Sequence, residues 1–496
     1  MYGPANDALA HGANVVAGNE SLGELSHSAA AYDVRHLTVA TLGLLTAAAV
    51  GAAVWRLSGS RPFALWAAAG LLAVPAWTGH AFFNPKDIPA ACGYTLVTVA
   101  LILALCERPG HPSSSRYRLA IAAMLAGGIF IGVGTRLALW LPFAASLVTY
   151  AALRLGQRRF GGIALRTQTD LTVAAGVAAC LGAFAVLYPN AAGHFLTPLV
   201  ESGSTSANIG WTGDTLTAGQ LLQSDQLPWW YLPTWIGASV PLLLGALAVL
   251  GAVLGIRALA TGRGTRRHGT VWSRPELGLL LVLQQAVLLP LGAVITAATM
   301  YDGMRHHLYV LPGIAILAGI GAERFWSWAR AKQPKKRWRV LGASLLGAAL
   351  LVPMAEQTLL FPYNYAYVNP VAGIGGVNER WEGDYWFASA PEALSRTPRT
   401  SPLLCKLLVL PDRPDLHGCL GDWFEPFTIR RGDAVEARWR NDSSAVWVIA
   451  VKRAGDRPPD YCEEIDNVTR WLRGERVTMS YVLRCDPAET ERDVVR

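Results

Sequence analysis

The chain has 496 residues, of which 52% are hydrophobic and only 16% are charged, and its formal net charge is +8. Soluble globular proteins carry about 25% charged residues, so this composition excludes an ordinary soluble enzyme, and its apolar content excludes a disordered chain. Residues 37–355 hold long apolar runs separated by short polar loops, whereas residues 356–496 have the composition of a soluble domain. The sequence therefore predicts an α-helical polytopic membrane protein with a soluble C-terminal domain.

Ten apolar runs approach the roughly 20 residues that a helix needs to cross the hydrocarbon core. They are residues 37–56, 62–79, 90–107, 117–134, 137–155, 170–188, 233–256, 277–298, 308–325 and 338–355. Only Thr135 and Arg136 separate the fourth run from the fifth, and both runs are rich in glycine and alanine. Small residues let helix backbones approach closely, so this pair predicts a tight helical hairpin; the alternative is one long broken helix.

The basic residues of the loops predict how the helices are oriented. Taking alternate loops, one set contains 21 Lys and Arg residues and the opposite set contains four. The positive-inside rule makes the first set cytoplasmic, which places residues 1–36 and the tail 356–496 on the extracytoplasmic side of the plasma membrane. Because topology accounts for the basic excess, the net charge does not indicate nucleic-acid binding.

Residues 1–36 form a polar segment on the outer side, with no helix before them and no signal-peptide pattern at Met1. We therefore expect that an upstream transmembrane helix is missing, and that residues 1–36 are the remnant of the first extracytoplasmic loop. A short polar tail that crosses the membrane unaided is the alternative.

The first cluster of polar residues on the outer side is residues 79–89, between two predicted spans. It contains His80, Asn84, Lys86 and Asp87 beside two phenylalanines. A helix capped by Asp87 with a surface ion pair is the simpler interpretation. That interpretation does not explain why the other polar residues gather there, so the cluster predicts a functional site.

Three further outer segments carry candidate residues. Arg136 lies in the tight loop between two spans, where contact with lipid phosphate is an alternative role. Residues 301–309 contain Asp302, Arg305 and the adjacent pair His306 and His307, of which at most one is expected to enter a site. The loop 189–232 ends with Trp229 and Trp230, which are equally consistent with an interfacial aromatic belt.

Together these residues predict a site for a lipid phosphate that carries a polar head group. Lys86, Arg136 and Arg305 are the candidate phosphate contacts, because Arg and Lys side chains bind phosphate oxygens. Asp87 and the histidines would contact the polar group, and the aromatic residues would bind a lipid chain or a sugar face. Charged groups this close to hydrocarbon cost several kcal/mol unless they are paired or hydrated, which favours a functional role.

The order and outer placement of these motifs resemble a known family, the glycosyltransferase family 39 of the GT-C superfamily. This family includes protein O-mannosyltransferase and aminoarabinose transferase relatives. The resemblance covers roughly residues 1–395 and lies in six segments, none of them as specific as a P-loop: 32–36, 80–89, 134–136, 301–309, 362–370 and 383–386.

The resemblance implies one transmembrane helix more than the ten apolar runs provide and a polyprenyl-phosphate-linked sugar donor. The sugar would pass, with inversion, to a hydroxyl of a protein or glycan acceptor. The family's general base lies just after the first helix, upstream of this chain, and no role is transferred to Asp7, Glu20, Glu24 or Asp33. Asp87 matches a second acidic position, implied to orient the acceptor or to bind a divalent metal. Without the base, this chain would bind the donor without turning it over.

The tail predicts a small α+β domain. Aromatic residues between 363 and 386 are dense enough to pack on the membrane part, and residues 407–410, 445–451 and 477–483 are the clearest strands. No catalytic constellation is visible, and the isolated His417 is expected at the surface. The domain would brace the outer loops or contact the acceptor.

The tail also contains four cysteines, Cys405, Cys419, Cys462 and Cys485. In an oxidising compartment an even set predicts disulfides, and we favour the local pairs Cys405–Cys419 and Cys462–Cys485 among the three pairings. Metal binding is the competing interpretation, but the C-x-x-C spacing that would support it is absent. Cys92, Cys106 and Cys180 lie in or beside apolar runs and are expected to remain thiols.

Two other function classes compete with an enzyme. A lipid-linked-sugar transporter would place ionisable groups in mid-span and show internal repeats, and neither is visible in the sequence. A non-catalytic membrane protein that binds sugar lipids remains the second alternative.

Overall fold

A computed structural model of the chain describes residues 4–26, 28–106, 114–161, 167–187, 201, 213–261, 277–331, 336–396, 403–404, 446–452 and 462–485. Within these residues, eight helices are long and apolar enough to cross a membrane. They include α2 (Ala29–Ser58), α5 (Asp87–Leu105), α6 (Ser115–Thr135), α8 (Thr167–Leu187), α11 (Leu242–Thr261) and α16 (Lys336–Leu360). The remaining two are residues 137–159, which comprise η1 (Leu137–Leu139) and most of α7 (Trp140–Gly161), and residues 278–295.

The first of these helices begins earlier than its apolar run. We predicted a span at 37–56, but α2 starts at Ala29, where the side chain of Ser28 accepts a hydrogen bond from the backbone N–H of Ala31. A serine cap stabilises a helix start even when the first turns are polar, which is why hydropathy alone set the boundary too late. The preceding segment is also ordered, since α1 (Ala5–Ala17) packs on α2 and α6.

Two predicted spans are each divided by a proline. The run 62–79 is split into α3 (Arg61–Leu72) and α4 (Pro75–Phe83), which are bent by 63° and count as a ninth span if they cross together. The run 233–256 is split into α10 (Tyr231–Ser239) and α11, with Pro241 in the break. Proline lacks the N–H that continues a helix, so each of the two breaks lies next to a proline in the sequence.

The run 277–298 forms α13 (Gly278–Leu283), the π-helical turn η5 (Gln284–Leu288) and α14 (Leu289–Ile295). The run 308–325 forms α15 (Val310–Ala331), which is a helix but is not among the eight described above. The number of spans therefore remains a prediction.

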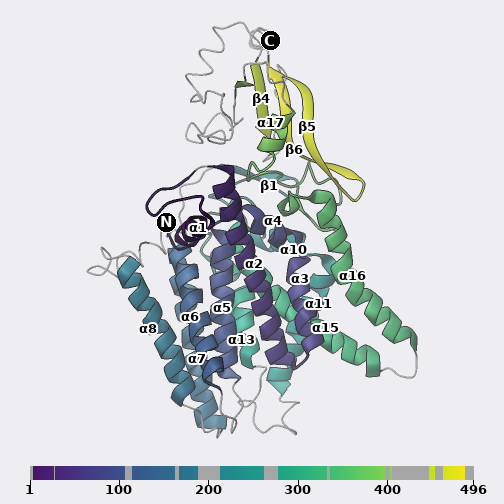
Figure 1. Cartoon of the computed structure of the whole chain (residues 1–496). Coiled ribbons are helices and arrows are strands. Elements are labelled where there is room, and N and C mark those ends of the chain that lie inside the picture. The colour runs from purple at the N-terminus through teal and green to yellow at the C-terminus, as the bar shows by residue number, and fades with distance from the viewer. Residues whose placement is uncertain are drawn as a thin grey trace.

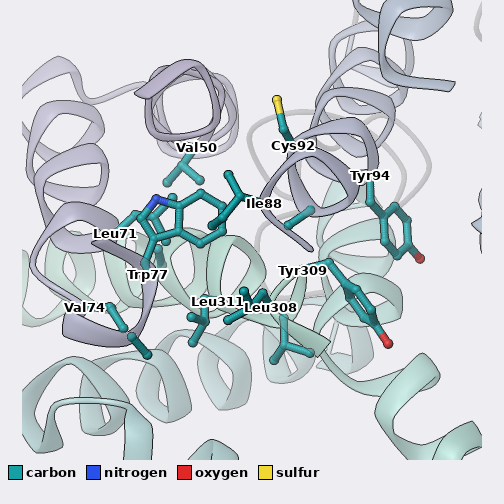
Figure 2. Packing of buried hydrophobic residues seen from close by; sticks show 14 of the residues in the cluster. Val50, Leu71, Val74, Trp77, Ile88, Cys92, Tyr94, Leu308, Tyr309 and Leu311 are labelled. Carbon is teal, nitrogen blue, oxygen red and sulfur yellow. The ribbon is translucent and has the colours of Figure 1, made fainter. Parts of the chain in front are cut away.

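Helix α5 lies at the centre of the bundle, and every one of its residues except Leu103 is buried. Figure 2 shows Ile88 of α5 next to Trp77 of α4, and Tyr94 beside Tyr309, whose ring centroid is 5.7 Å away. This apolar packing fixes the N-terminal half of α5 against α4 and against the start of α15.

Glycines join α5 to α6 rather than α6 to α7. A Cβ built on Gly93 would lie 2.5 Å from Gly128 O and from Gly132 N, so glycine is required for this approach. The two runs around Arg136 are separate helices, as predicted, but α6 packs mainly against α5 and α8 instead of forming a tight hairpin with α7. The glycines were therefore assigned to the wrong neighbour, because small residues indicate close packing without naming the partner.

The C-terminal residues form a four-stranded sheet in the order β3-β4-β6-β5. Its strands are β3 (Leu403–Leu404), β4 (Val446–Val451), β5 (Cys462–Leu472) and β6 (Glu475–Cys485), and α17 (Ala390–Ser395) contacts the last three of them. The predicted strands 445–451 and 477–483 are confirmed, whereas β5 was not predicted. Residues 407–410, Cys405, Cys419 and His417 lie outside the described part of the chain.

The sheet lies at one end of the helical bundle, together with α1, α4 and the hairpin of β1 (Asp214–Thr217) and β2 (Gln220–Gln223) (Figure 1). The segment 363–389 lies between α16 and the sheet in the chain and packs on the helices, as its aromatic residues predicted: Tyr365 contacts Phe83 and His80 of α4. The residues that we predicted as functional lie at this end.

Candidate functional site

The corner between α4 and α5 is organised by the buried side chain of Asn84. Its Oδ1 accepts hydrogen bonds from the backbone N–H groups of Lys86 (3.1 Å) and Asp87 (2.8 Å). The simpler interpretation of the sequence made Asp87 the helix cap. In the structure Asp87 is the first residue of α5 and Lys86 precedes the helix, while the side chain of Asn84 accepts the backbone N–H groups at the helix start. The carboxylate of Asp87 is thereby left for other contacts.

The orientation of Asn84 determines the tautomer of His80. Because the amide oxygen of Asn84 accepts from two backbone N–H groups, its Nδ2 must be the atom that faces Asp87 Oδ2 (2.7 Å) and His80 Nδ1 (3.1 Å). An amide nitrogen only donates, so His80 Nδ1 accepts and the ring proton lies on Nε2. His80 is therefore a neutral imidazole whose Nε2–H donates to Tyr385 Oη at 3.1 Å.

This relay leaves the phenolic proton of Tyr385 available to an incoming oxygen atom. Burial and the nearby Asp302 carboxylate raise the pKa of Tyr385 well above its usual value, so the phenol keeps its proton. A chain of fixed donors thus runs from Asn84 through His80 to Tyr385.

Asp87 also forms an ion pair with Arg136, which directly follows α6. The carboxylate is almost fully buried, and the guanidinium is about one-fifth exposed. Asn84 and Arg136 therefore bind different oxygens of the same carboxylate and join the α4–α5 corner to the end of α6.

The second part of the site is the turn before α15. Asp302 and Gly303 both have left-handed backbone conformations, with φ of 56° and 66°, and lead into the 3₁₀ turn η6 (Arg305–His307). A Cβ on Gly303 would lie 3.1 Å from the ring of Trp235, so both the conformation and the packing favour glycine. This tight turn brings Asp302 and Arg305 together, and their side chains form an ion pair at 3.0 Å.

Arg305 is held by aromatic rings as well as by Asp302. Its guanidinium carbon lies 4.8 Å from the ring centroid of Tyr301 and 5.0 Å from that of Trp386. The Trp386 ring in turn contacts His80, with centroids 6.2 Å apart. Arg305 is therefore fixed beside the His80–Tyr385 relay, and cation–π contacts of this kind contribute about 0.5–2 kcal/mol each.

The two adjacent histidines point to different neighbours. The ring of His306 contacts Tyr301 at 4.7 Å, whereas that of His307 contacts Tyr309 at 5.6 Å. Burial, assisted by the positive charge of Arg136, lowers the pKa of His307 to about 4, and burial together with Arg305 lowers that of His306 well below its usual value. Both rings are therefore neutral at physiological pH, and His306 Nε2 has no hydrogen-bond partner among the described residues.

A segment from the C-terminal part completes the site. Asp384 is buried, and its carboxylate accepts hydrogen bonds from Ser389 N (2.8 Å), Ser389 Oγ (2.6 Å), Ala388 N (3.1 Å) and the hydroxyl of Tyr365. Ser389 Oγ also bonds to Ser480 Oγ of β6 at 2.9 Å. These bonds fix the turn that carries Tyr385 and Trp386 into the site.

The structure thus brings most of the predicted residues together. His80, Asn84, Asp87 and Arg136 form one connected group, which Trp386 and Tyr385 link to the group of Asp302, Arg305 and His306. Tyr385 and Trp386 were not among the predicted site residues. Their sequence signals were the aromatic density between 363 and 386, which we interpreted as packing, and the family resemblance of residues 383–386, from which no site role was drawn.

Three predicted residues are less central to this network. Lys86 joins it through its backbone N–H, which bonds to Asn84, while its side chain is exposed at the start of α5. Trp229 is 73% exposed, and neither Trp229 nor Trp230 makes a polar or ring contact with the network in the described structure. Trp230 directly precedes Tyr231, whose hydroxyl donates to Gly303 O at 3.3 Å. In the part of the chain that the structure describes, no three His, Cys, Asp or Glu side chains form a group able to hold a metal ion.

Comparisons with known proteins give structural likenesses only. No protein-family model and no curated protein sequence matches the chain. The structure is similar to ArnT from Cupriavidus metallidurans in the apo state, with a TM-score of 0.45 and 15% identity over 97% of this chain and 87% of ArnT. For ArnT bound to undecaprenyl phosphate the TM-score is 0.42 with 14% identity over the same shares of the two chains.

A further likeness is to the archaeal oligosaccharyltransferase AglB from Archaeoglobus fulgidus, solved with an inhibitory peptide and a dolichol-phosphate. The TM-score is 0.43 with 15% identity over 80% of this chain and 50% of AglB.

Proposed function

We propose that the chain is a membrane glycosyltransferase that uses a polyprenyl-phosphate-linked sugar as donor. In this proposal the sugar passes, with inversion at the anomeric carbon, to a hydroxyl of a protein or glycan acceptor. The reaction takes place on the side of the membrane that carries the C-terminal sheet, which we assign to the extracytoplasmic face of the plasma membrane. The donor class rests on the family resemblance in the sequence, and the residue roles rest on the site described above.

The observation that carries the proposal is the fixed position of Arg305. Asp302, Tyr301 and Trp386 hold its guanidinium before any ligand binds, and its side chain is only 13% exposed. A preorganised guanidinium binds phosphate oxygens strongly, because little conformational freedom is lost and water is excluded. Arg305 is therefore our main candidate for the donor phosphate.

The arrangement also suits the chemistry of the transfer. The bond between the anomeric carbon and the phosphate oxygen breaks, and polyprenyl phosphate leaves with the bonding electron pair. The acceptor oxygen bonds to that carbon, and the acceptor hydroxyl releases its proton to water, because none of the described residues is assigned as the general base. Negative charge develops on the leaving phosphate, where Arg305 and the Tyr385 hydroxyl would stabilise it. Since His80 fixes the Tyr385 oxygen as an acceptor, the phenolic proton is directed to the ligand.

Asp87 and Arg136 have a supporting role in this proposal. The ion pair with Asp87 holds the partly exposed Arg136, which would form a second phosphate contact, and the exposed Lys86 would form a third. Asp87 would also orient the acceptor hydroxyl, as the family resemblance implies.

Binding of the lipid carrier is the first experiment. The full chain in lipid nanodiscs is titrated with undecaprenyl phosphate and, separately, with undecaprenol, which lacks the phosphate. We expect binding of the phosphate only, and at least tenfold weaker binding by Arg305→Gln, because the phosphate then loses a charge-assisted hydrogen bond worth about 1.5–3 kcal/mol. The matched control is Arg330→Gln, an exposed arginine at the opposite end of α15. Equal affinity for undecaprenyl phosphate and undecaprenol would show that the chain does not recognise the phosphate, and would contradict the proposed site.

Transfer itself is measured with radiolabelled polyprenyl-phosphate sugars and hydroxyl acceptors, and the anomeric configuration of the product tests inversion. Phosphate-dependent binding without transfer from any donor would instead support the non-catalytic sugar-lipid-binding protein. Movement of the labelled lipid between the leaflets of sealed vesicles would support the transporter.

A further inference from the structure

The hairpin of β5 and β6 reaches down from the sheet to the end of α16. Its two turn residues, Arg473 and Gly474, have φ of 51° and 85°, as a tight hairpin turn requires. Arg473 Nη1 pairs with Glu356 Oε1 at 2.9 Å, and Arg473 Nη2 donates to Val368 O at 2.6 Å. The turn is therefore attached to α16 and to the segment that follows it.

A second contact fixes the hairpin next to the turn. Arg470 Nε donates to Phe361 O at 2.8 Å, and its guanidinium carbon lies 4.7 Å from the ring centroid of Tyr363. Since Phe361 directly follows α16, the two arginines hold the hairpin at both sides of the last helical residue, Leu360.

These contacts set the level of the hairpin relative to the membrane. Glu356 lies four residues before the end of α16, which corresponds to about 6 Å along the helix axis. Around it, Val352 (53%), Met354 (47%) and Leu359 (51%) expose apolar side chains, as expected for a surface that faces lipid. The helix has 25 residues and is about 37 Å long, whereas the hydrocarbon core is about 30 Å thick, so a helix of this length can place its end in the headgroup layer.

The hairpin carries an exposed aromatic–cation pair at this level. Trp471 is 50% exposed and lies directly opposite Arg476 in the strand register, with the guanidinium carbon of Arg476 5.3 Å from its ring. Phe361 is also exposed, at 57%. Tryptophan favours the interface between lipid and water because its ring is apolar and its N–H is polar, and arginine beside it suits lipid phosphates.

We propose that the tip of the β5–β6 hairpin is a membrane anchor that lies in the headgroup layer of the leaflet on the side of the sheet. Trp471 and Phe361 insert between lipid headgroups, and Arg476 binds their phosphates. The anchor holds the C-terminal sheet against the bundle independently of any reaction at the site.

The test uses the full chain in nanodiscs with an environment-sensitive fluorophore (NBD) attached at Trp471→Cys. The control position is Ile465→Cys, a 45% exposed residue on the same strand, six residues or about 20 Å from Trp471. The unsubstituted chain is labelled in parallel, and its signal from the native cysteines is subtracted. Quenching is compared between a spin label on the lipid headgroup and iodide in the water.

We expect headgroup quenching at position 471 to exceed that at position 465 at least threefold. Arg476→Gln should reduce the quenching at 471 in vesicles that contain anionic lipid. Quenching at 471 by iodide alone would show that the tip lies in water, and protection from both quenchers would show that protein covers it. Either of these outcomes would contradict the proposed membrane anchor and would leave the proposal for the donor site unaffected.

Discussion

The side chains of His80 and Tyr385 meet at 3.1 Å although 305 residues separate them in the chain. This bond joins the corner between α4 and α5 to the segment that leads into the C-terminal sheet. Tyr385 therefore links the sheet to the site. Its hydroxyl oxygen accepts the hydrogen bond from His80 Nε2–H, which leaves its own proton free to be donated to a ligand.

Replacing Tyr385 by Phe should weaken ligand binding or transfer without unfolding the chain. The change removes the hydroxyl that would donate to the phosphate, and a hydrogen bond to a charged group contributes about 1.5–3 kcal/mol, or about ten- to a hundredfold. The measurement is the affinity for undecaprenyl phosphate together with kcat/KM for transfer.

The matched control for this variant is Tyr117→Phe. Tyr117 is half-buried at the start of α6, and its hydroxyl donates to Leu103 O at 2.9 Å, away from the site. If both variants lose the same activity, or if Tyr385→Phe loses none, the donor role of Tyr385 is wrong.

Asp87 and Arg136 should behave as a coupled pair. Removing one partner of a buried ion pair costs about 3–5 kcal/mol, because the other charge remains buried and unpaired. The partial exposure of Arg136 places the expected loss at the lower end of this range. The measurement is a double-mutant cycle: the free energy of unfolding is determined for the unsubstituted chain, Asp87→Asn, Arg136→Gln and the double variant.

We expect the double variant to be destabilised by clearly less than the sum of the two single changes. Additive losses would show that the two side chains do not interact in the membrane. The same cycle on undecaprenyl phosphate affinity separates stability from binding, since of this pair Arg136, and not Asp87, is proposed to contact the phosphate.

The fold could be predicted from the sequence where hydrophobicity acts locally. Every one of the ten apolar runs contains helix in the structure. The boundaries were missed where other forces act, namely the Ser28 cap and the breaks at Pro75 and Pro241. Strand β5 was missed because it is an edge strand with few apolar residues, and two register shifts, at Glu464/Asp466 and Val468/Thr469, interrupt its alternation.

The same distinction applies to the site. Asn84 lies four residues and Asp87 seven residues after His80 in the chain, so local clustering indicated them correctly as neighbours. Tyr385 and Trp386 come from a distant segment. Residues 383–386 carried part of the family resemblance, but an aromatic side chain in such a segment is equally typical of packing and of a site. Trp229 shows the opposite error: it was predicted as a site residue but is exposed and outside the network. A tryptophan at the membrane interface and a tryptophan that binds a ligand look alike in a single sequence.

Glu392 should govern part of the acid stability of the chain. Partial burial alone would raise its pKa, but hydrogen bonds from Arg470 and Tyr363, with Arg396 beside them, lower the pKa to about 2 from the usual 4.5. The stabilisation from this carboxylate is therefore complete above pH 4.5 and is lost as the pH falls toward 2.

Between pH 5 and pH 3 the unfolded chain takes up a proton at this position while the folded chain does not. The midpoint of thermal unfolding should therefore fall more steeply with pH in the unsubstituted chain than in Glu392→Gln. Ser389 and the site are not changed by this substitution, so ligand binding at pH 7 serves as the control for a native fold. Identical slopes would show that Glu392 is not held by Arg470.

The C-terminal sheet places two cysteines opposite each other, since Cys462 and Cys485 are direct partners in the antiparallel pairing of β5 and β6. Directly opposite residues in such a pair have Cα atoms about 4.5–5.5 Å apart, which lies within the range of about 4.4–6.8 Å that a disulfide spans. We therefore expect the Cys462–Cys485 bond, one of the two pairs favoured from the sequence, in protein prepared from an oxidising compartment.

Peptide mapping under non-reducing conditions should recover the linked pair, and reduction should destabilise the sheet by about 3 kcal/mol. Cys92 and Cys180, which are buried thiols in α5 and α8, should react with an alkylating reagent only after unfolding. Alkylation of Cys462 and Cys485 in the folded, unreduced chain would disprove the bond.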